Sequence, residues 1–426
     1  MDHIDSYYAA SANRAPLRPQ LPGGDIDADV CVVGGGLAGC STALHLAQRG
    51  YRVVLLEAHR VGWGASGRSG GQAIFGYSAS QDKLVAQVGR DDAKKMFDIS
   101  VEALDLLESL VTQHQIDCDF HRGHVHVAIK PRQETELREF QQELARDYGY
   151  TSPRWLDRAE VAGLLQTERY RCGLRDDRSG HLHPLNYTLG LAAAAEAAGV
   201  RVYEQTDVVG LDFGATVRVR TANGATVHAK HVALCCNAYI DARISKKLRD
   251  RIMSVGTYII ATESLGRERI EALVRDNVAV NDMNFVLDYF RRSADHRLLF
   301  GGRVSYSGRD ALDTARATRV RMLNVFPQLA DTKIEYAWGG YVDITMSRAP
   351  DFGRLAPNVY YLQGFSGHGI ALTGMAGKLV AETIAGQSER FDLFTKLKHR
   401  VFPGGPALRM PALVLAMLWF RLKDLL

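Results

Sequence analysis

Short apolar runs and a helical stretch alternate near the start of the chain. Residues 29–33 (DVCVV) are apolar and rich in β-branched side chains, as in a buried strand, and residues 51–56 (YRVVLL) repeat that pattern. Between them, residues 40–49 have the periodicity of a helix, which Gly50 ends. Two buried strands joined by one helix predict a β-α-β unit with parallel strands.

Helical and strand patterns continue to alternate over the rest of the chain, and no internal repeat is present. Helices are predicted at 91–114, 132–148, 186–199 and 369–385. Strands are predicted at 201–209, 216–220, 226–228, 231–235, 251–262 and 297–305. The first residues, with prolines at 16, 19 and 22, are expected to form an arm on the surface. This order predicts a mixed α/β protein.

The composition is that of an ordinary globular protein. The chain has 426 residues, 46% of them hydrophobic and 23% charged, which suits two interleaved domains. Its net charge is only +4 and its basic residues are scattered, so no nucleic-acid partner is expected. Six cysteines form no CxxC pair, and no secretory signal is visible, so a reducing cytoplasm is the expected compartment.

The strongest motif directly follows the first predicted strand. Residues 34–39 read GGGLAG, which is a GxGxxG pattern. Gly34 permits the tight turn, Gly36 lets the backbone approach a pyrophosphate, and Gly39 lets the helix pack closely on the strand. Glu57 ends the next strand, at the distance where an acidic residue binds a ribose hydroxyl pair. The motif predicts a dinucleotide site rather than a glycine-rich turn without a ligand.

Two further glycine-rich stretches distinguish this chain from a simple nicotinamide dehydrogenase. Residues 62–72 (GWGASGRSGGQ) would allow backbone contact along a long cofactor, although a flexible loop has the same composition. Residues 364–369 (GFSGHG) open a helix, whose N-terminus would stabilise negative charge on a reduced flavin ring. A helix entry capped by a serine is the alternative interpretation of that turn.

Together the three stretches resemble the FAD-dependent oxidoreductases of the D-amino-acid-oxidase superfamily. Further shared segments are 6–13 (SYYAASAN), 64–68, 179–186 (SGHLHPLN) and 402–405 (FPGG). The likeness is greatest to members that oxidise γ-glutamylputrescine in polyamine catabolism, and L-pipecolate oxidases of lysine catabolism look similar. It implies an α/β (mixed α+β) fold, with a Rossmann-like FAD-binding domain of the glutathione-reductase type and an antiparallel-sheet substrate domain over the flavin.

The resemblance also implies how the chain is divided. Residues 1–26 would form the arm, and 27–80, 155–240 and 335–390 a discontinuous FAD-binding domain. Residues 81–154 and 241–334 would form the substrate domain, and 391–426 a tail with an apolar helix.

The residues expected to bind FAD follow from the same resemblance. The ADP half would contact Gly34, Gly36, Leu37, Ala38, Gly39, Glu57 and Ala58. The pyrophosphate and ring would lie along Ala65, Ser66, Gly67, Arg68, Ser69, Gly71 and Gln72. Val208 matches a backbone contact to adenine, and Asn237 also belongs to the cofactor site. The pyrimidine end of the ring would contact Gly367, His368, Gly369, Ile370 and Thr373.

Three departures from the related sarcosine oxidases shape the expected chemistry. Ala371 stands where they carry a lysine that clamps the substrate carboxylate, and Leu299 where a lysine promotes reaction with oxygen. The segment 339–345 has no cysteine to tether the flavin. Non-covalent FAD and a different substrate clamp are therefore expected. The electron acceptor is either oxygen or a quinone or another electron carrier.

The expected reaction is hydride transfer from a carbon–nitrogen bond of a small amine or amino acid to flavin N5, which gives an imine. His368, Tyr289 and Arg303 are the candidate catalytic residues. Arg291, Arg292 and Arg303 could bind a substrate carboxylate, because a guanidinium presents a matching fork. Each has a structural alternative, as a core tyrosine, a satisfied histidine or a surface arginine. Trp338 is expected near the ring or in the core.

Three histidines resemble a metal cluster at first sight. His124 and His126 alternate along a predicted strand and share a face with each other, and His121 precedes them. No cysteine or carboxylate pattern completes a ligand set, and flavin chemistry requires no metal. No metal is therefore expected.

The last segment leaves two interpretations open. Residues 410–420 (MPALVLAMLWF) are apolar and flanked by basic residues, but they are too few to span a bilayer. They could pack on the body or on a second subunit, or contact the inner membrane surface. A flavin-binding redox subunit without turnover is the alternative function of another class.

Overall fold

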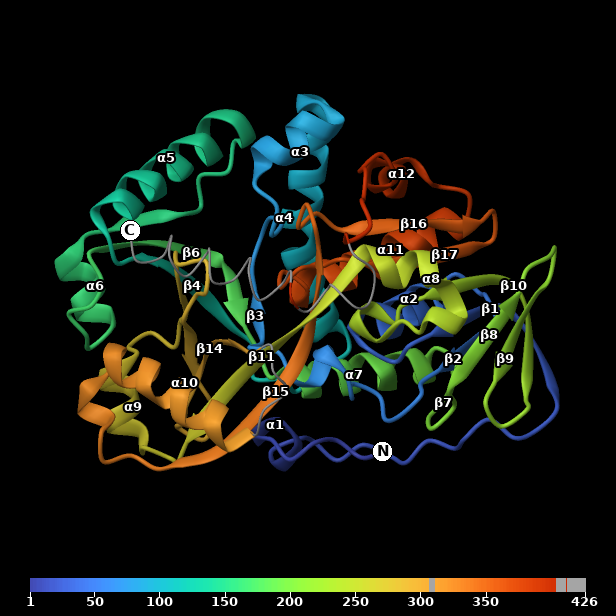
Figure 1. Cartoon of the computed structure of the whole chain (residues 1–426), viewed down its shortest axis with the longest axis horizontal. Coiled ribbons are helices and arrows are strands. Elements are labelled where there is room, and N and C mark those ends of the chain that lie inside the picture. Colours follow the sequence, from blue (N-terminus) through green and yellow to red (C-terminus); the bar gives the residue numbers. More distant parts are fainter. Residues whose placement is uncertain (306–310, 404–410, 412–426) are drawn as a thin grey trace.

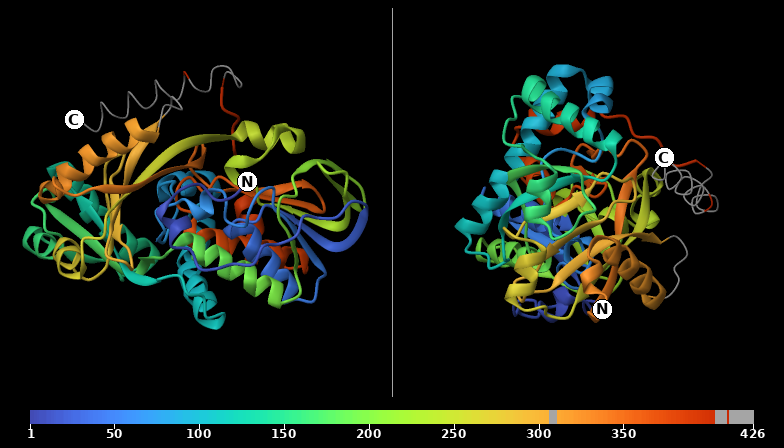
Figure 2. Two further views of the ribbon diagram at one scale, coloured as in Figure 1. Left: turned by 90° about the horizontal axis from the view of Figure 1, so that it is seen from below. Right: turned by 90° about the vertical axis from the view of Figure 1, so that its left-hand side faces the viewer.

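Two sheets lie side by side along the long axis of the molecule (Figure 1). The structure is a computed structural model that describes residues 1–305, 311–403 and 411. For residues 303–305 and 311–314 it describes the backbone alone. Helices cover the outer faces of both sheets, and segments of the chain cross between them several times (Figures 1 and 2).

The first sheet contains the predicted β-α-β unit. β1 (Asp25–Val33), α2 (Leu37–Ala47) and β2 (Val53–Leu56) follow one another, and β1 pairs parallel with β2. The sheet order is β16 (Asp351–Ala356), β17 (Val359–Gln363), β10 (Thr226–Leu234), β1, β2 and β7 (Arg201–Tyr203). β8 (Val208–Asp212) and β9 (Val217–Thr221) extend it beside β10. The pairs from β7 to β17 are parallel, and only β16 on this path runs antiparallel.

Two strand predictions in this region are wrong in detail. The predicted strand 201–209 is divided into β7 and β8, because the chain turns between them with Gln205 at a φ of +50°. Conversely, the separate strands predicted at 226–228 and 231–235 are one strand, β10, which pairs with β1 along its whole length. Polar residues such as Lys230 interrupt its apolar pattern where the strand extends toward solvent.

All four predicted helices are confirmed, and each begins and ends within two residues of the expected positions. They are α4 (Arg90–Gln113), α5 (Pro131–Tyr148), α7 (Pro184–Ala197) and α11 (Ile370–Ile384). α2 packs on the first sheet and lies against both α7 and α11, and these three helices contribute to its core. Their contact is close because Gly377 of α11 has no side chain: a Cβ there would lie 2.5 Å from the backbone nitrogen of Thr42.

The second sheet is antiparallel as expected, with one exception. Its order is β15 (Ile334–Thr345), β11 (Ile252–Thr262), β14 (Leu298–Ser305), β13 (Tyr289–Arg292), β12 (Ala279–Asp282), β4 (His121–Ala128), β6 (Cys172–His181) and β3 (Gln72–Ala73), with β5 (Arg154–Leu156) beside β6. Only β12 and β4 pair parallel. β6 and β15 belong to this sheet, although their residues fall in ranges assigned to the FAD-binding domain. The residue ranges of the two domains therefore stay a proposal.

Helices with an apolar inner face cover the second sheet. α6 (Arg158–Leu164), α9 (Arg267–Leu273) and α10 (Ala311–Val325) surround its core, which includes Phe290, Phe300 and Phe326. The remaining helices are α1 (Tyr7–Ala10), α3 (Gln81–Val88), α8 (Ala242–Arg251) and α12 (Glu389–Thr395).

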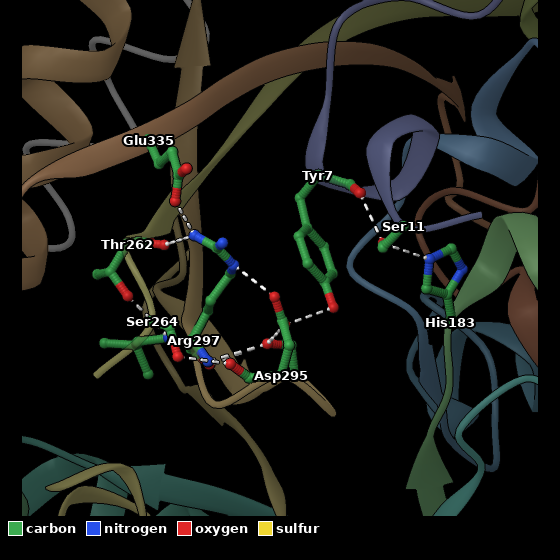
Figure 3. Close-up of polar contacts among 10 residues, drawn as sticks. Tyr7, Ser11, His183, Thr262, Ser264, Asp295, Arg297 and Glu335 are labelled. Atoms are coloured by element: carbon green, nitrogen blue, oxygen red, sulfur yellow. Dashed lines mark hydrogen bonds and ion pairs between the residues drawn. The ribbon is translucent and has the colours of Figure 1, made fainter. Parts of the chain in front are cut away.

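The N-terminal arm is not simply a surface segment, which corrects the sequence expectation. Tyr7 and Tyr8 are 4% and 0% exposed, because α1 inserts between the two halves of the molecule. Tyr7 Oη donates to Asp295 Oδ1 at 2.8 Å, and Ser11 Oγ contacts His183 Nε2 at 3.1 Å (Figure 3). Arg297 donates to the other oxygen of Asp295 at 2.6 Å, so the second sheet fixes the acceptor for Tyr7 (Figure 3).

None of the helices within the described residues is long and apolar enough to cross a membrane. The apolar tail at 410–420 lies outside the described residues, apart from Pro411.

Candidate functional site

The first glycine-rich turn is packed so closely that three positions admit no side chain. A Cβ at Gly39 would lie 1.8 Å from the carbonyl oxygen of Gly34, and one at Gly34 would lie 2.7 Å from that of Cys235. Ser66 fills the space beside Gly36, 2.8 Å from where a Cβ would stand, and its Oγ accepts the first backbone N–H of α2 at 2.9 Å. The turn therefore joins β1, α2, the end of β10 and the second glycine-rich stretch.

Glu57 lies beside this turn, at the carboxyl end of β2. Its Oε2 accepts a hydrogen bond from Gly35 N at 2.6 Å, and its Oε1 accepts one from His59 N at 2.9 Å. Burial raises the pKa of this carboxyl group. Thr206 N donates to the carbonyl oxygen of Glu57 at 2.8 Å, which brings the start of β8 at Val208 close by. These groups gather at the carboxyl edge of parallel strands, where open α/β sheets bind ligands.

The second glycine-rich stretch contains polar atoms that lack a partner. Arg68 Nη2 and Ser69 Oγ are buried and make no hydrogen bond within the described part of the chain. The backbone of this stretch is nevertheless fixed, since Trp338 Nε1 donates to Arg68 O at 3.0 Å. Buried polar atoms nearly always have partners. A polar cofactor such as FAD would supply them here, so the residues present fit that group.

The third glycine-rich turn places the N-terminus of α11 at the same site. Gly364, Ser366 and Gly367 have φ values of +80°, +52° and +97°, and such a turn is rare for a non-glycine residue such as Ser366. α11 has 15 residues and no acidic side chain in its first turn, so its positive dipole end is not neutralised there. The hydroxyl of Thr373 donates to Gly369 O at 2.6 Å, so its proton is already used in a hydrogen bond at the start of the helix.

A buried carboxylate, Asp343, holds this turn from behind. It is 1% exposed and accepts a hydrogen bond from Gly364 N. With its amide nitrogen turned toward the carboxylate, Asn237 donates to Asp343 Oδ1 at 2.9 Å. Burial raises the pKa of Asp343 to about 7, while the backbone N–H of Gly364 acts in the opposite direction. Asn237 therefore contributes to the site by contacting Asp343.

One row of residues on the second sheet faces the glycine-rich stretches. His126, Asn281, Tyr289 and Gly301 lie on four neighbouring strands in direct register, so their side chains share a face. The ring of Tyr289 fills the space beside Gly70, 2.7 Å from where a Cβ would stand. This contact puts Tyr289 against the second stretch, and its catalytic role stays a prediction.

Neutral imidazoles gather at the end of this row. His126 Nε2 contacts Asn281 Nδ2 at 2.8 Å, and His124 is buried with Nε2 unpaired within the described residues. Burial lowers the pKa of both His126 and His368 to about 4, and the neighbouring His126 also lowers the pKa of His368. The structure therefore brings His126 of β4 close to His368 of the third turn, and both are uncharged at neutral pH. No three metal-binding side chains in the described ranges are arranged to hold a metal ion.

Two of the three candidate arginines are already engaged. Arg291 is fully buried and donates to Gly70 O at 2.9 Å, to Leu182 O at 2.9 Å and to Tyr8 Oη at 3.1 Å. Its donors are used to hold backbone, so the expectation that it binds a substrate carboxylate is wrong. Arg292 lies 3.7 Å from Glu271. Arg303 of β14 pairs with Tyr258 of β11, but its side chain is outside the described part of the structure.

Sequence reasoning missed Asn281, Asp343 and Arg348. Asn281 and Asp343 each directly follow apolar residues in a strand (AVND and YVDIT), and this change to a polar residue is the signal that could have drawn attention to them. Arg348 follows β15 and gives no such signal, because a single arginine in a loop is common.

This chain belongs to the family of FAD dependent oxidoreductases, whose model matches residues 29–383. It is 42% identical to "Gamma-glutamylputrescine oxidoreductase" of Escherichia coli, over 99% of each chain. It is 40% identical to "Probable oxidoreductase OrdL" of Haemophilus influenzae, over 99% of this chain and 98% of that one.

Solved structures show the same fold at much lower sequence identity. The crystal structure of glycine oxidase from Geobacillus kaustophilus superposes with a TM-score of 0.73 and 21% identity, covering 88% of this chain and 99% of that one. L-proline dehydrogenase from P. horikoshii gives a TM-score of 0.71 and 20% identity, with 88% and 98% coverage. The expected architecture, an FAD-binding half with an antiparallel substrate sheet, is therefore confirmed.

Proposed function

We propose that this enzyme oxidises the primary amine of γ-glutamylputrescine, or of a similar acylated diamine, to an imine that water hydrolyses to an aldehyde and ammonia. Its class, FAD-dependent oxidation of an amine or amino acid, follows from the family and from 42% identity along the whole chain to an oxidoreductase of that name. The observation that carries the proposal is this likeness along the whole chain, joined to a site whose histidines are neutral.

The chain's own residues are suited to an uncharged amine. Bound FAD would accept the hydride from the carbon next to the amine nitrogen. His368 and His126 have a pKa of about 4 because they are buried, so neither repels a substrate by positive charge at neutral pH. His368 can accept a hydrogen bond from an amine N–H, whereas the Nε2 acceptor of His126 is already used by the Nδ2 donor of Asn281. Tyr289 forms a wall beside the second glycine-rich stretch and keeps water from it.

We propose the same cofactor contacts that the resemblance implies, with FAD held non-covalently. The segment Gly339–Thr345 contains no cysteine, and the buried Arg68 and Ser69 atoms can bind the cofactor by hydrogen bonds. Acid precipitation of the yellow protein should leave the flavin in the supernatant. Leu299 is buried in an apolar cluster where related oxidases carry a lysine. Slow reaction with oxygen, and a quinone or protein carrier as acceptor in the cytoplasm, is therefore proposed.

The test is flavin bleaching without oxygen. The purified protein is mixed with γ-glutamylputrescine, putrescine, L-pipecolate, sarcosine and D-alanine, and the absorbance of oxidised flavin is followed. Rapid bleaching by γ-glutamylputrescine and slow bleaching by putrescine are expected. The proposal is wrong if another amine is clearly preferred. If dithionite bleaches the flavin and no amine does, a redox subunit without turnover is the better interpretation. The relatives named above give no support to L-pipecolate.

A further inference from the structure

Arg348 lies in a loop that packs directly on the third glycine-rich turn. The loop joins β15 to β16, and Thr345 Oγ1 closes it by donating to Ala349 O at 2.8 Å. A Cβ at Gly364 would lie 2.7 Å from the side chain of Thr345, so the loop and the turn are in close contact. Arg348 has a φ of +62°, a conformation that is uncommon for a residue with a Cβ. The loop therefore holds Arg348 in a fixed position beside the site.

The guanidinium of Arg348 has no acidic partner in the described ranges of the chain. Its carbon lies 4.3 Å from the centre of the Phe285 ring, and its side chain makes no ion pair or hydrogen bond there. Burial alone lowers the pKa of Arg348, and its charge contributes to the lowered pKa of His368, so the two groups are near each other. A half-buried guanidinium with several free donors is matched by a carboxylate.

Three other arginines near the site are already engaged within the described residues. Arg291 is saturated by backbone oxygens, Arg292 lies near Glu271, and Arg321 pairs with Asp288. The position of Ala371, where related enzymes clamp a carboxylate next to the reacting amine, carries no charge.

We propose that Arg348 binds a substrate carboxylate that is remote from the oxidised amine. This inference rests on the proposed function, and it defines the substrate class as acylated diamines whose acyl group is acidic. γ-Glutamylputrescine has that chemistry: a primary amine at one end and a carboxylate on the glutamyl group at the other. In this arrangement His368 is a neighbour of Arg348, and the ring of Phe285 packs on the guanidinium.

The experiment compares two substrates that differ only in this charge. γ-Glutamylputrescine and its derivative with the carboxylate converted to a carboxamide are mixed with the holoenzyme without oxygen, and the rate and apparent Kd of flavin reduction are measured. The natural enzyme should prefer the carboxylate by about 10- to 100-fold, the range for a hydrogen bond to a charged group. Arg348→Gln should remove that preference by raising the apparent Kd of the carboxylate substrate. The rate and apparent Kd with the carboxamide should stay within about threefold of the natural enzyme. Arg348→Lys should restore part of the preference.

A matched control is Arg138→Gln, because Arg138 also lies over an aromatic ring, 3.8 Å from Trp155, but on the remote helix α5. This variant should change neither the rate nor the apparent Kd of flavin reduction with either substrate. The inference is overturned if the natural enzyme does not distinguish the two substrates, or if Arg348→Gln weakens both equally or releases FAD, which would place the guanidinium on the flavin.

A binding measurement separates this inference from the proposed function. Glutarate, a dicarboxylate without an amine, should bind the natural holoenzyme in calorimetry and bind Arg348→Gln at least about tenfold more weakly. If γ-glutamylputrescine does not bleach the flavin, and glutarate binding still depends on Arg348, the substrate proposal fails and the carboxylate site stands. If glutarate binding is the same in both proteins, the carboxylate site is wrong.

Discussion

Two buried ionisable side chains fix the backbone of the glycine-rich stretches by opposite means. Arg291 donates to the carbonyl oxygen of Gly70, and Asp343 accepts the N–H of Gly364. One polar side chain can therefore hold a turn whose glycines contribute no side chains of their own. At the residue scale, these two side chains therefore shape the candidate cofactor site through its backbone.

Asp343 makes stability depend on pH in a predictable direction. Burial raises its pKa to about 7 in the folded protein, so the folded state binds the proton more tightly than the unfolded state. Stability from this group is complete below pH 4 and is lost as the pH rises toward 7. Relative to the natural chain, Asp343→Asn should gain about 2–3 kcal/mol in unfolding free energy between pH 5 and pH 8.

Urea denaturation at several pH values measures this difference. The control is Asp98→Asn, at an exposed position. The difference in unfolding free energy between this variant and the natural chain should change by less than about 0.5 kcal/mol over the same pH range. A constant offset for Asp343→Asn across the pH range would show that Asp343 is ionised throughout.

At the element scale, the position of α2 depends on the absence of side chains at its first turn. The helix begins one residue after Gly36, and Gly39 lets it approach the backbone of Gly34 at the end of β1. Helix and strand can then present free N–H groups to the same phosphate. The packing of α2, rather than flexibility of the turn, is what the glycines provide.

Gly39→Ala should therefore disrupt the packing of α2 against the end of β1. The added Cβ would meet the carbonyl oxygen of Gly34 at 1.8 Å, and a backbone atom cannot rotate away. We expect a loss of about 3 kcal/mol or more in stability, together with loss of bound FAD. The matched control is Gly163→Ala in α6, where no atom lies within 4 Å, and it should gain up to about 1 kcal/mol. The ratio of flavin absorbance to protein gives the FAD content of each variant, and the denaturant midpoint gives its stability. Full FAD content in Gly39→Ala would show that the close packing of α2 is not required for FAD binding.

Elements with a strong local pattern could be predicted from the sequence, and those set by long-range contacts could not. α4 and α5 have clear amphipathic periods, and the β-α-β unit carries its own glycine signature. β15 was not predicted, because it pairs with β11, which is distant in the sequence: Ile252 lies opposite Thr345, and Thr262 opposite Ile334. Site residues were predictable by type where a motif held them, as with Glu57. The partners of Arg291 are backbone oxygens of distant segments, which no local pattern reveals.

At the scale of the whole molecule, the N-terminal arm and the second glycine-rich stretch hold the two sheets together. β3, at the end of that stretch, pairs with β6 of the second sheet. Tyr8 of the arm packs on Trp338 of the second sheet and on His183 of the first half, with ring centres 5.1 Å and 4.9 Å apart. Its hydroxyl accepts a hydrogen bond from Arg291, which also holds Gly70. The arm thus supports the cofactor site through one buried arginine.

Substitutions at Tyr8 test this coupling between the arm and the flavin. Tyr8→Phe removes one hydrogen bond but keeps the ring, so it should cost about 1–2 kcal/mol and retain FAD. Tyr8→Ala also leaves a cavity, which should cost about 3–5 kcal/mol and loosen Arg291 from Gly70. Free flavin fluorescence should then rise at lower denaturant than in the natural protein. The control is Phe213→Ala, a large side chain that is 54% exposed and should change stability by less than about 0.5 kcal/mol. If Tyr8→Ala loses stability but releases flavin no earlier than it unfolds, the arm stabilises the fold without supporting the site.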